Sequence, residues 1–259
     1  MKRTELSLVA VLGALALFVG SESYQSTLRL HHTRSVSSGT VAALAPNAPT
    51  VRSSGGATTS ELPLELRRMD KSDVKERLER DGAGTYIGEL LADRDSALAR
   101  WPDRVDHPLR IWIAAGSNVK GWQAGYVNEV RSAFDTWSTV GIPVRFQLAP
   151  DSAHADVHVR WVDHFDEPIS GKTVWSRDDR WWIVDGDITL ALHHRDGDPL
   201  DAPQVRAIAL HEVGHLLGLD HTTDASNIMA PRVRVRELSP ADQATLRLLY
   251  SVPAGKIAG

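Results

Sequence analysis

Two histidines and a glutamate lie close together in the segment HEVGHLLGLDH, residues 211–221. His211 and His215 are four residues apart, so on an α-helix they lie on the same face, one turn apart. Two imidazoles at that separation can bind one metal ion. Glu212 follows the first histidine and is suited to take a proton from a metal-bound water. This pattern alone is weak, because it recurs by chance on ordinary helices.

A glycine and a third histidine extend the pattern and make it specific. Gly218 lacks a Cβ and can adopt the left-handed conformation that ends a helix, which would bring His221 back as a third ligand. Three neutral imidazoles without a thiolate suit zinc with an open fourth position, which is the catalytic arrangement. Glu212 would pass the water proton to the leaving amine, so we expect amide hydrolysis without a covalent enzyme intermediate.

The elements that must position these residues are predicted from capping residues and apolar periodicity. Asp201 and Pro203 mark the start of the helix that carries the first two histidines. Alternating apolar residues predict five strands, at 108–114, 144–148, 155–162, 172–177 and 187–192. Apolar residues at offsets of three and four predict a helix after Gly121, with the buried stripe Val127, Val130, Phe134 and Trp137. This order indicates an α+β (α/β) protein whose mixed sheet is backed by helices.

The first hundred residues differ from the rest of the chain. Residues 1–23 are predicted to be a signal peptide, because two basic residues precede an apolar run of fifteen residues, shorter than the roughly 20 that span a bilayer. An uncleaved anchor is the alternative. Residues 24–100 are predicted to be a flexible linker, in which Ser72 could cap a short helix that ends at Gly82. This zone could also be a pro-segment, or a helical collar packed on the main domain, residues 101–259.

Composition excludes several classes of function. Lys and Arg number 29 against 33 Asp and Glu, so the chain has no bulk positive charge for binding nucleic acid. The chain has no cysteine, which excludes a disulfide scaffold, a thiol nucleophile and a Cys-ligated metal. We expect an exported monomer, periplasmic or extracellular, with no nucleic-acid partner and no stable membrane span.

The zinc motif resembles a known family. HEVGHLLGLDH is similar to the extended signature of the metzincin metallopeptidases, and Met229 in NIMAP resembles their Met-turn. The residues around it, and the region 101–250 more diffusely, look most like the matrixin branch, which includes the matrix metalloproteinases. The resemblance implies a twisted, mostly parallel mixed sheet with a long active-site helix and a C-terminal helix. It also implies zinc at His211, His215 and His221, with Glu212 as general base.

Departures from the matrixin pattern concern other metal ions and latency. His164 and Asp166 match two ligands of the structural zinc of animal matrixins, but Trp175 and Thr189 stand near the other two positions, so we expect no second zinc. Several loop aspartates could bind Ca2+, although their spacing does not define a site: Asp185, Asp187, Asp196, Asp198 and Asp201. Latency through a cysteine cannot operate in a chain without one.

The predicted function is therefore a secreted zinc-dependent metalloendopeptidase. Its partner would be a protein or peptide substrate, paired as an extended strand with the exposed strand at 172–177. Two alternatives remain open. One is an exported, non-enzymatic zinc-binding module, which the presence of Glu212 disfavours because a structural site needs no base. The other is a zinc hydrolase of cell-wall peptides, which would use the same catalytic residues.

Overall fold

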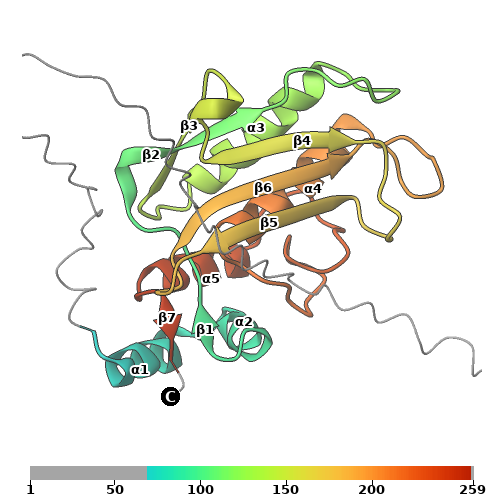
Figure 1. Cartoon of the computed structure of the whole chain (residues 1–259). Helices are drawn as coiled ribbons and strands as arrows, with labels where there is room; N and C mark the ends of the chain where they lie inside the picture. Colours follow the sequence, from blue (N-terminus) through green and yellow to red (C-terminus); the bar gives the residue numbers. More distant parts are fainter. Residues whose placement is uncertain (1–68, 258–259) are drawn as a thin grey trace, which may run out of the picture.

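A twisted sheet of five strands forms one layer of the molecule (Figure 1). The computed structural model describes residues 69–257, so the predicted signal peptide and residues 24–68 of the predicted linker lie outside the described residues. The strands are β2 (Arg104–Ile113), β3 (Val144–Leu148), β4 (Val157–Val162), β5 (Gly171–Arg177) and β6 (Ile183–Ala191). Their order is β3-β2-β4-β6-β5. Only β5 runs antiparallel to its neighbour, so the predicted mixed, mostly parallel sheet is confirmed.

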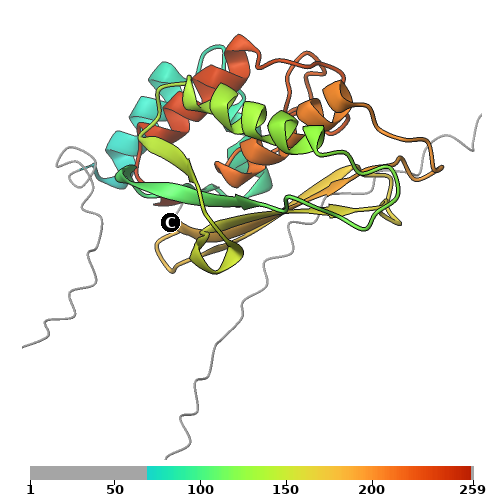
Figure 2. The ribbon, with the colours of Figure 1, turned by 90° about the horizontal axis from the view of Figure 1, so that it is seen from above.

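Two long helices cover one face of this sheet (Figure 2). They are α3 (Gly125–Ser138) and α4 (Ala202–Leu216). The four residues of the apolar stripe predicted for the first helix are all buried in α3. Trp137 also donates a hydrogen bond from its indole Nε1 to the Leu210 carbonyl oxygen, at 2.9 Å. The stripe therefore fixes α3 against α4, the helix with the metal motif.

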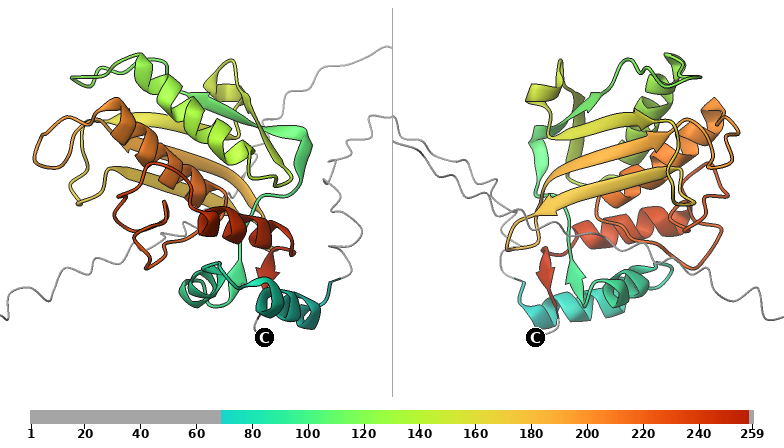
Figure 3. Two further views of the ribbon diagram at one scale, coloured as in Figure 1. Left: turned by 180° about the vertical axis from the view of Figure 1, so that it is seen from behind. Right: turned by 45° about the vertical axis from the view of Figure 1, so that its right-hand side comes forward.

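The segment before the sheet packs beside the C-terminal helix α5 (Pro240–Tyr250), as Figure 3 shows. It contains α1 (Lys71–Asp81), α2 (Ile87–Asp93) and β1 (Ala97–Leu98), which pairs with β7 (Gly255–Lys256). Leu90 and Leu98 have no exposed surface. Tyr86 donates its hydroxyl to Asp242 at 3.0 Å, and its main-chain N–H to Thr245 Oγ1 at 3.0 Å. Residues 69–100 thus form a collar packed on the main domain, which was one of the three interpretations of this zone.

The predicted cap of α1 was wrong by two residues. Asp70, not Ser72, is the N-cap, because its carboxylate accepts the N–H groups of Ser72 and Asp73. Ser72 also donates its hydroxyl to Asp70. Gly82 follows the last helical residue, as predicted.

A short 3-10 turn, η1 (Ser152–His154), completes the list of elements. Within the described range, no helix is both long and apolar enough to cross a membrane.

Candidate active site

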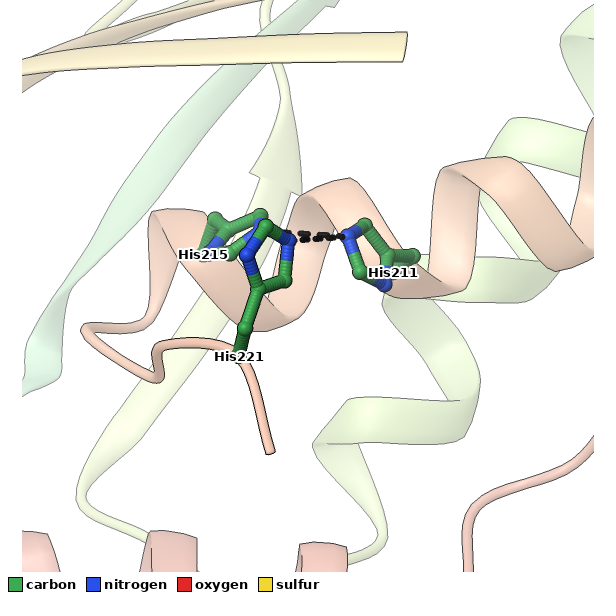
Figure 4. Close-up of side chains that lie close together, drawn as sticks. All are labelled: His211, His215 and His221. Atoms are coloured by element: carbon green, nitrogen blue, oxygen red, sulfur yellow. Dashed lines mark hydrogen bonds between the residues drawn. The ribbon is translucent and has the colours of Figure 1, made fainter. Parts of the chain in front are cut away.

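The three histidines of the motif converge on one point (Figure 4). His211 and His215 project from α4, and His221 lies on the loop that follows it. The Nε2 atoms are 3.1 Å apart for the pair on the helix, and His221 Nε2 lies 3.2 Å from His215 and 3.3 Å from His211. A tetrahedral zinc with bonds of about 2.0–2.1 Å has ligand atoms about 3.3 Å apart. The spacing of these nitrogens fits that geometry.

Hydrogen bonds on the far side of two rings fix their tautomers. His211 Nδ1 lies 2.7 Å from the Ile228 carbonyl oxygen, and His215 Nδ1 lies 3.1 Å from that of Leu219. Carbonyls only accept, so each Nδ1 carries the proton and each Nε2 presents a lone pair to the common point. Burial also lowers the pKa of all three imidazoles, that of His211 to about 4. Neutral rings that direct Nε2 atoms toward a common point are placed to hold a cation between them.

The helix that carries the first two ligands is well defined at both ends. Asp201 accepts the Gln204 N–H, and the Gln204 side chain accepts the Asp201 N–H, so a capping box starts α4 as predicted. At the other end, Gly218 has a φ of +100°. Its N–H donates to the carbonyl oxygen of His215, and the N–H of Leu219 donates to the carbonyl oxygen of Gly214. This pair of bonds is a Schellman motif, which reverses the chain toward the third ligand.

The turn at Gly218 also needs glycine for space. A Cβ there would lie 2.2 Å from the Ala99 carbonyl oxygen, so a side chain would collide with the main chain of the collar. The predicted role of this glycine is confirmed, and the structure adds the close approach as a second reason for it.

Glu212 is buried beside the triad, under the start of the edge strand β5. Thr173 donates its hydroxyl to Glu212 Oε2 at 2.6 Å and lies 3.0 Å from the Glu212 carbonyl oxygen. A Cβ on Gly171 would lie 2.4 Å from Glu212 Oε1, so the strand leaves just enough room for the carboxylate. Burial raises the pKa of Glu212 to about 7, and the Thr173 hydrogen bond opposes that rise. A buried carboxylate with such a pKa can both accept and release a proton near neutral pH.

A methionine packs beneath the metal-binding helix. Met229 has no exposed surface, and a Cβ on Gly214 would lie 2.3 Å from its sulfur. The Met229 carbonyl oxygen accepts the Thr222 N–H at 3.0 Å, one residue after the third ligand. The neighbouring segment is held by Asp242 of α5, whose Oδ2 accepts the Ile228 N–H at 2.9 Å. The turn at Met229 thus packs against the helix that carries His211 and His215, and it binds the main chain next to His221.

The sheet edge nearest the triad is open for pairing. β5 is the last strand in the sheet order and pairs only with β6 among the described strands. A pocket of about 510 Å³ lies beside its first residue. The pocket is lined by Pro168, Ile169, Ser170, His194, Arg195, Asp196 and Arg232. Ser170, the residue directly before β5, lines this pocket, whereas Glu212 and the three histidines do not.

Comparison with known proteins agrees with this geometry. The family model for matrixins matches residues 115–251. The chain belongs to the matrixin family. The metzincin resemblance of the zinc motif is thereby confirmed.

Individual relatives match the chain over part of their length. Metalloendoproteinase 1-MMP of Arabidopsis thaliana is 32% identical over 141 residues, which cover 46% of this chain and 36% of the plant protein. Metalloendoproteinase 1 of Glycine max is 32% identical over 148 residues, which cover 49% of this chain and 46% of the soybean protein. Matrix metalloproteinase-16 of Homo sapiens is 30% identical over 128 residues, which cover 39% of this chain and 19% of the human protein. The chain therefore spans less than half the length of each of these relatives.

Three of the other predicted metal ligands bind other protein groups. Within residues 69–257 the triad is the one group of three or more such side chains placed to hold an ion. His164 Nδ1 lies 2.7 Å from Asp163, Asp201 caps α4, and Asp187 pairs with Arg160. Calcium binding stays a prediction.

Sequence reasoning missed three residues of the site. Thr173 orients Glu212, and Glu89 and Arg94 of the collar contact the loop around His221. No local pattern could have identified them, because each lies at least 39 residues from its partner.

Proposed function

We propose that this chain is a secreted zinc-dependent metalloendopeptidase, with His211, His215 and His221 as zinc ligands and Glu212 as general base. The observation that carries the proposal is the buried Glu212 carboxylate, held by Thr173 beside three converging imidazole nitrogens. A purely structural metal site needs no buried base of this kind. The matrixin family is zinc dependent, and its named relatives are metalloendoproteinases.

The residues of the chain divide the chemistry between them. A zinc ion held by the triad would supply Lewis acidity that polarises the scissile carbonyl and acidifies a water. Glu212 accepts the proton of the attacking water and returns it to the leaving amine. Thr173 holds the carboxylate in place through its 2.6 Å hydrogen bond. The carbonyls behind His211 and His215 keep both rings in the tautomer that exposes Nε2.

The substrate is proposed to be an extended peptide. Its main chain would pair with the open edge of β5, where the hydrogen-bonding groups on one side have no strand partner in the described sheet. The side chain next to the scissile bond would then enter the pocket that adjoins Gly171. Arg195 and Arg232 outnumber Asp196 at this pocket, so its net positive charge favours an acidic side chain there.

Cleavage of a mixed peptide library by the purified protein tests the proposal. Glu212→Gln is the control, because it keeps the size of the side chain and removes its basicity. Both proteins should bind one zinc per chain, and the variant should cleave about 10²- to 10⁴-fold more slowly. Equal cleavage by the two proteins would refute the role of Glu212.

The same assay separates the alternatives. Zinc binding without cleavage by the parent protein would favour the non-enzymatic binding module. Cleavage confined to cell-wall peptides would favour the cell-wall hydrolase.

The proposed export is tested by expressing the full chain and determining the N-terminus of any exported product, which should begin near residue 24. Light scattering on the same product tests the proposed monomer.

A further inference from the structure

Two side chains of the collar reach the loop that carries the third histidine. This loop, residues 218–223, is called the ligand loop here. Arg94, just after α2, and Glu89, within α2, both contact it. Neither residue lies within the 115–251 region that matches the matrixin family model. The ligand loop is therefore held in part by a segment outside that region.

Arg94 makes three hydrogen bonds, and all of them go to the ligand loop. Its Nε donates to Asp220 Oδ2 at 2.9 Å, and its two terminal nitrogens donate to the carbonyl oxygens of Gly218, at 2.8 Å, and Leu219, at 3.1 Å. The side chains of this ion pair are only 9% and 11% exposed. A planar guanidinium can hold three acceptors in one fixed arrangement, which a lysine cannot.

Two of the three acceptors of Arg94 also bind residues of the proposed metal ligand set. The Leu219 carbonyl oxygen accepts from both Arg94 and His215 Nδ1, so it fixes the tautomer of the second ligand. Asp220 accepts the main-chain N–H of His221 through Oδ1 while Oδ2 binds Arg94. Arg94 thus supports the imidazole of His215 through the Leu219 carbonyl oxygen, and the main chain of His221 through Asp220.

Glu89 holds the other end of the ligand loop. Its carboxylate accepts the Thr222 hydroxyl at 3.0 Å and the Thr223 N–H at 2.7 Å. These two residues directly follow His221 in the chain. Together Arg94 and Glu89 bind the loop on both sides of the third ligand, before it at residues 218–220 and after it at residues 222–223.

We propose that Arg94 and Glu89 are positioning residues of the metal centre, and that the collar is a permanent part of the working enzyme rather than a removable pro-segment. The proposal rests on the proposed function, because it takes the triad to be the zinc site. It implies that any proteolytic maturation leaves Glu89 and Arg94 attached to the domain. A chain that begins at residue 101 would lose five hydrogen bonds to the ligand loop.

Zinc release tests the role of Arg94 without reference to activity. The full-length protein is loaded with zinc and placed in excess chelator, at a temperature below the onset of unfolding, and the rate of zinc loss is followed with a metal indicator. Arg94→Met should release zinc about tenfold faster than the parent, the lower end of the roughly 10- to 100-fold loss of metal affinity on removing a direct hydrogen-bond partner of a ligand, because Arg94 acts through such partners. Arg94→Lys should fall between the two, because it keeps the charge and loses the three-point geometry.

Arg247→Met is the matched control. Arg247 also binds main chain, donating from Nε to the Val140 carbonyl oxygen at 2.9 Å, but it does not contact the ligand loop. This variant should release zinc at the parent rate. Release from Arg94→Met at the parent rate, or equally fast release from both variants, would overturn the proposal. Glu89→Gln gives a second test if Arg94→Met does not fold, and it should also release zinc faster than the parent.

The N-terminus of the active protein tests whether the collar is a permanent part of the enzyme. We expect every cleaving form isolated from the native host to retain Glu89 and Arg94. An active form that begins after residue 94 would overturn the proposal while leaving the proposed function intact. A parent protein that binds no zinc would overturn the proposed function, and this inference with it.

Discussion

Replacing Gly171 by alanine should displace Glu212, the proposed catalytic base, without removing the metal. A Cβ at this position would lie 2.4 Å from Glu212 Oε1, 2.7 Å from Cγ and 2.8 Å from Cδ. All three distances are shorter than real Cβ contacts, so a rotation of the terminal carboxylate alone cannot relieve them. The carboxylate must retreat by about 1 Å to reach ordinary contact distance. That movement also breaks its hydrogen bond with Thr173.

The magnitude follows from the sensitivity of catalysis to geometry. A misplacement of about 1 Å can cost about 10²-fold in rate, which is about 2.7 kcal/mol of transition-state stabilisation. We therefore expect kcat of Gly171→Ala to fall about a hundredfold, with one zinc still bound per chain. Because Glu212 acts in the proton transfer, kcat should fall much more than KM rises.

The assay is steady-state cleavage of a fluorogenic peptide, which compares kcat and KM of Gly171→Ala with those of the parent. Zinc content is measured on the same samples. Gly116→Ala is the control, because a Cβ at that position meets no atom within 4 Å and no positive φ is involved. An unchanged kcat in Gly171→Ala would refute the placement of Glu212 as the base. A rise in KM alone would mean that the methyl group blocks the substrate instead.

Four further outcomes are expected. Gly214→Ala should lower the free energy of unfolding in urea by about 1–3 kcal/mol, because the new Cβ overlaps the sulfur of Met229. Burial and the nearby Asp242 raise the pKa of Tyr86, so the folded protein keeps a proton that the unfolded chain loses above about pH 10. Between pH 10 and 11, the free energy of unfolding should therefore fall by about 1 kcal/mol more in the parent than in Tyr86→Phe. Chelation of zinc should abolish cleavage and lower the melting temperature, and stoichiometric zinc should restore both. Peptides with Glu beside the scissile bond should be cut faster than their Gln counterparts, and Arg232→Glu should reverse that order.

Strand positions were predictable where residues alternate, and less so where glycine interrupts the pattern. The predicted strand at 187–192 begins at Ile183 in the structure, because β6 pairs with β5 through Asp185 and Gly186. Both residue types are unfavourable in strands when judged alone. Gly186 is required there by packing, since a Cβ would lie 2.5 Å from Leu216 of α4. A contact between sheet and helix thus overrode the local preference.

The sequence by itself determined the local parts of the site. One helical turn separates His211 from His215, and Gly218 can reverse the chain within three residues of His221, so the ligand set follows from spacing. The caps of α4 and α5 are equally local, because each is a side chain bonded to an N–H three residues away.

Only the tertiary structure decided what surrounds those parts. Thr173 reaches Glu212 because β5 packs against α4, and Arg94 reaches the ligand loop because the collar packs beside α5. These partners are 39 and at least 124 residues apart in the chain. Hydrogen bonds over such separations leave no periodicity in the sequence, because any residue on a suitably placed strand or helix could supply them. Spacing along the helix and the turn after it therefore predicts which nitrogen atoms converge, and packing between distant segments decides what holds them in place.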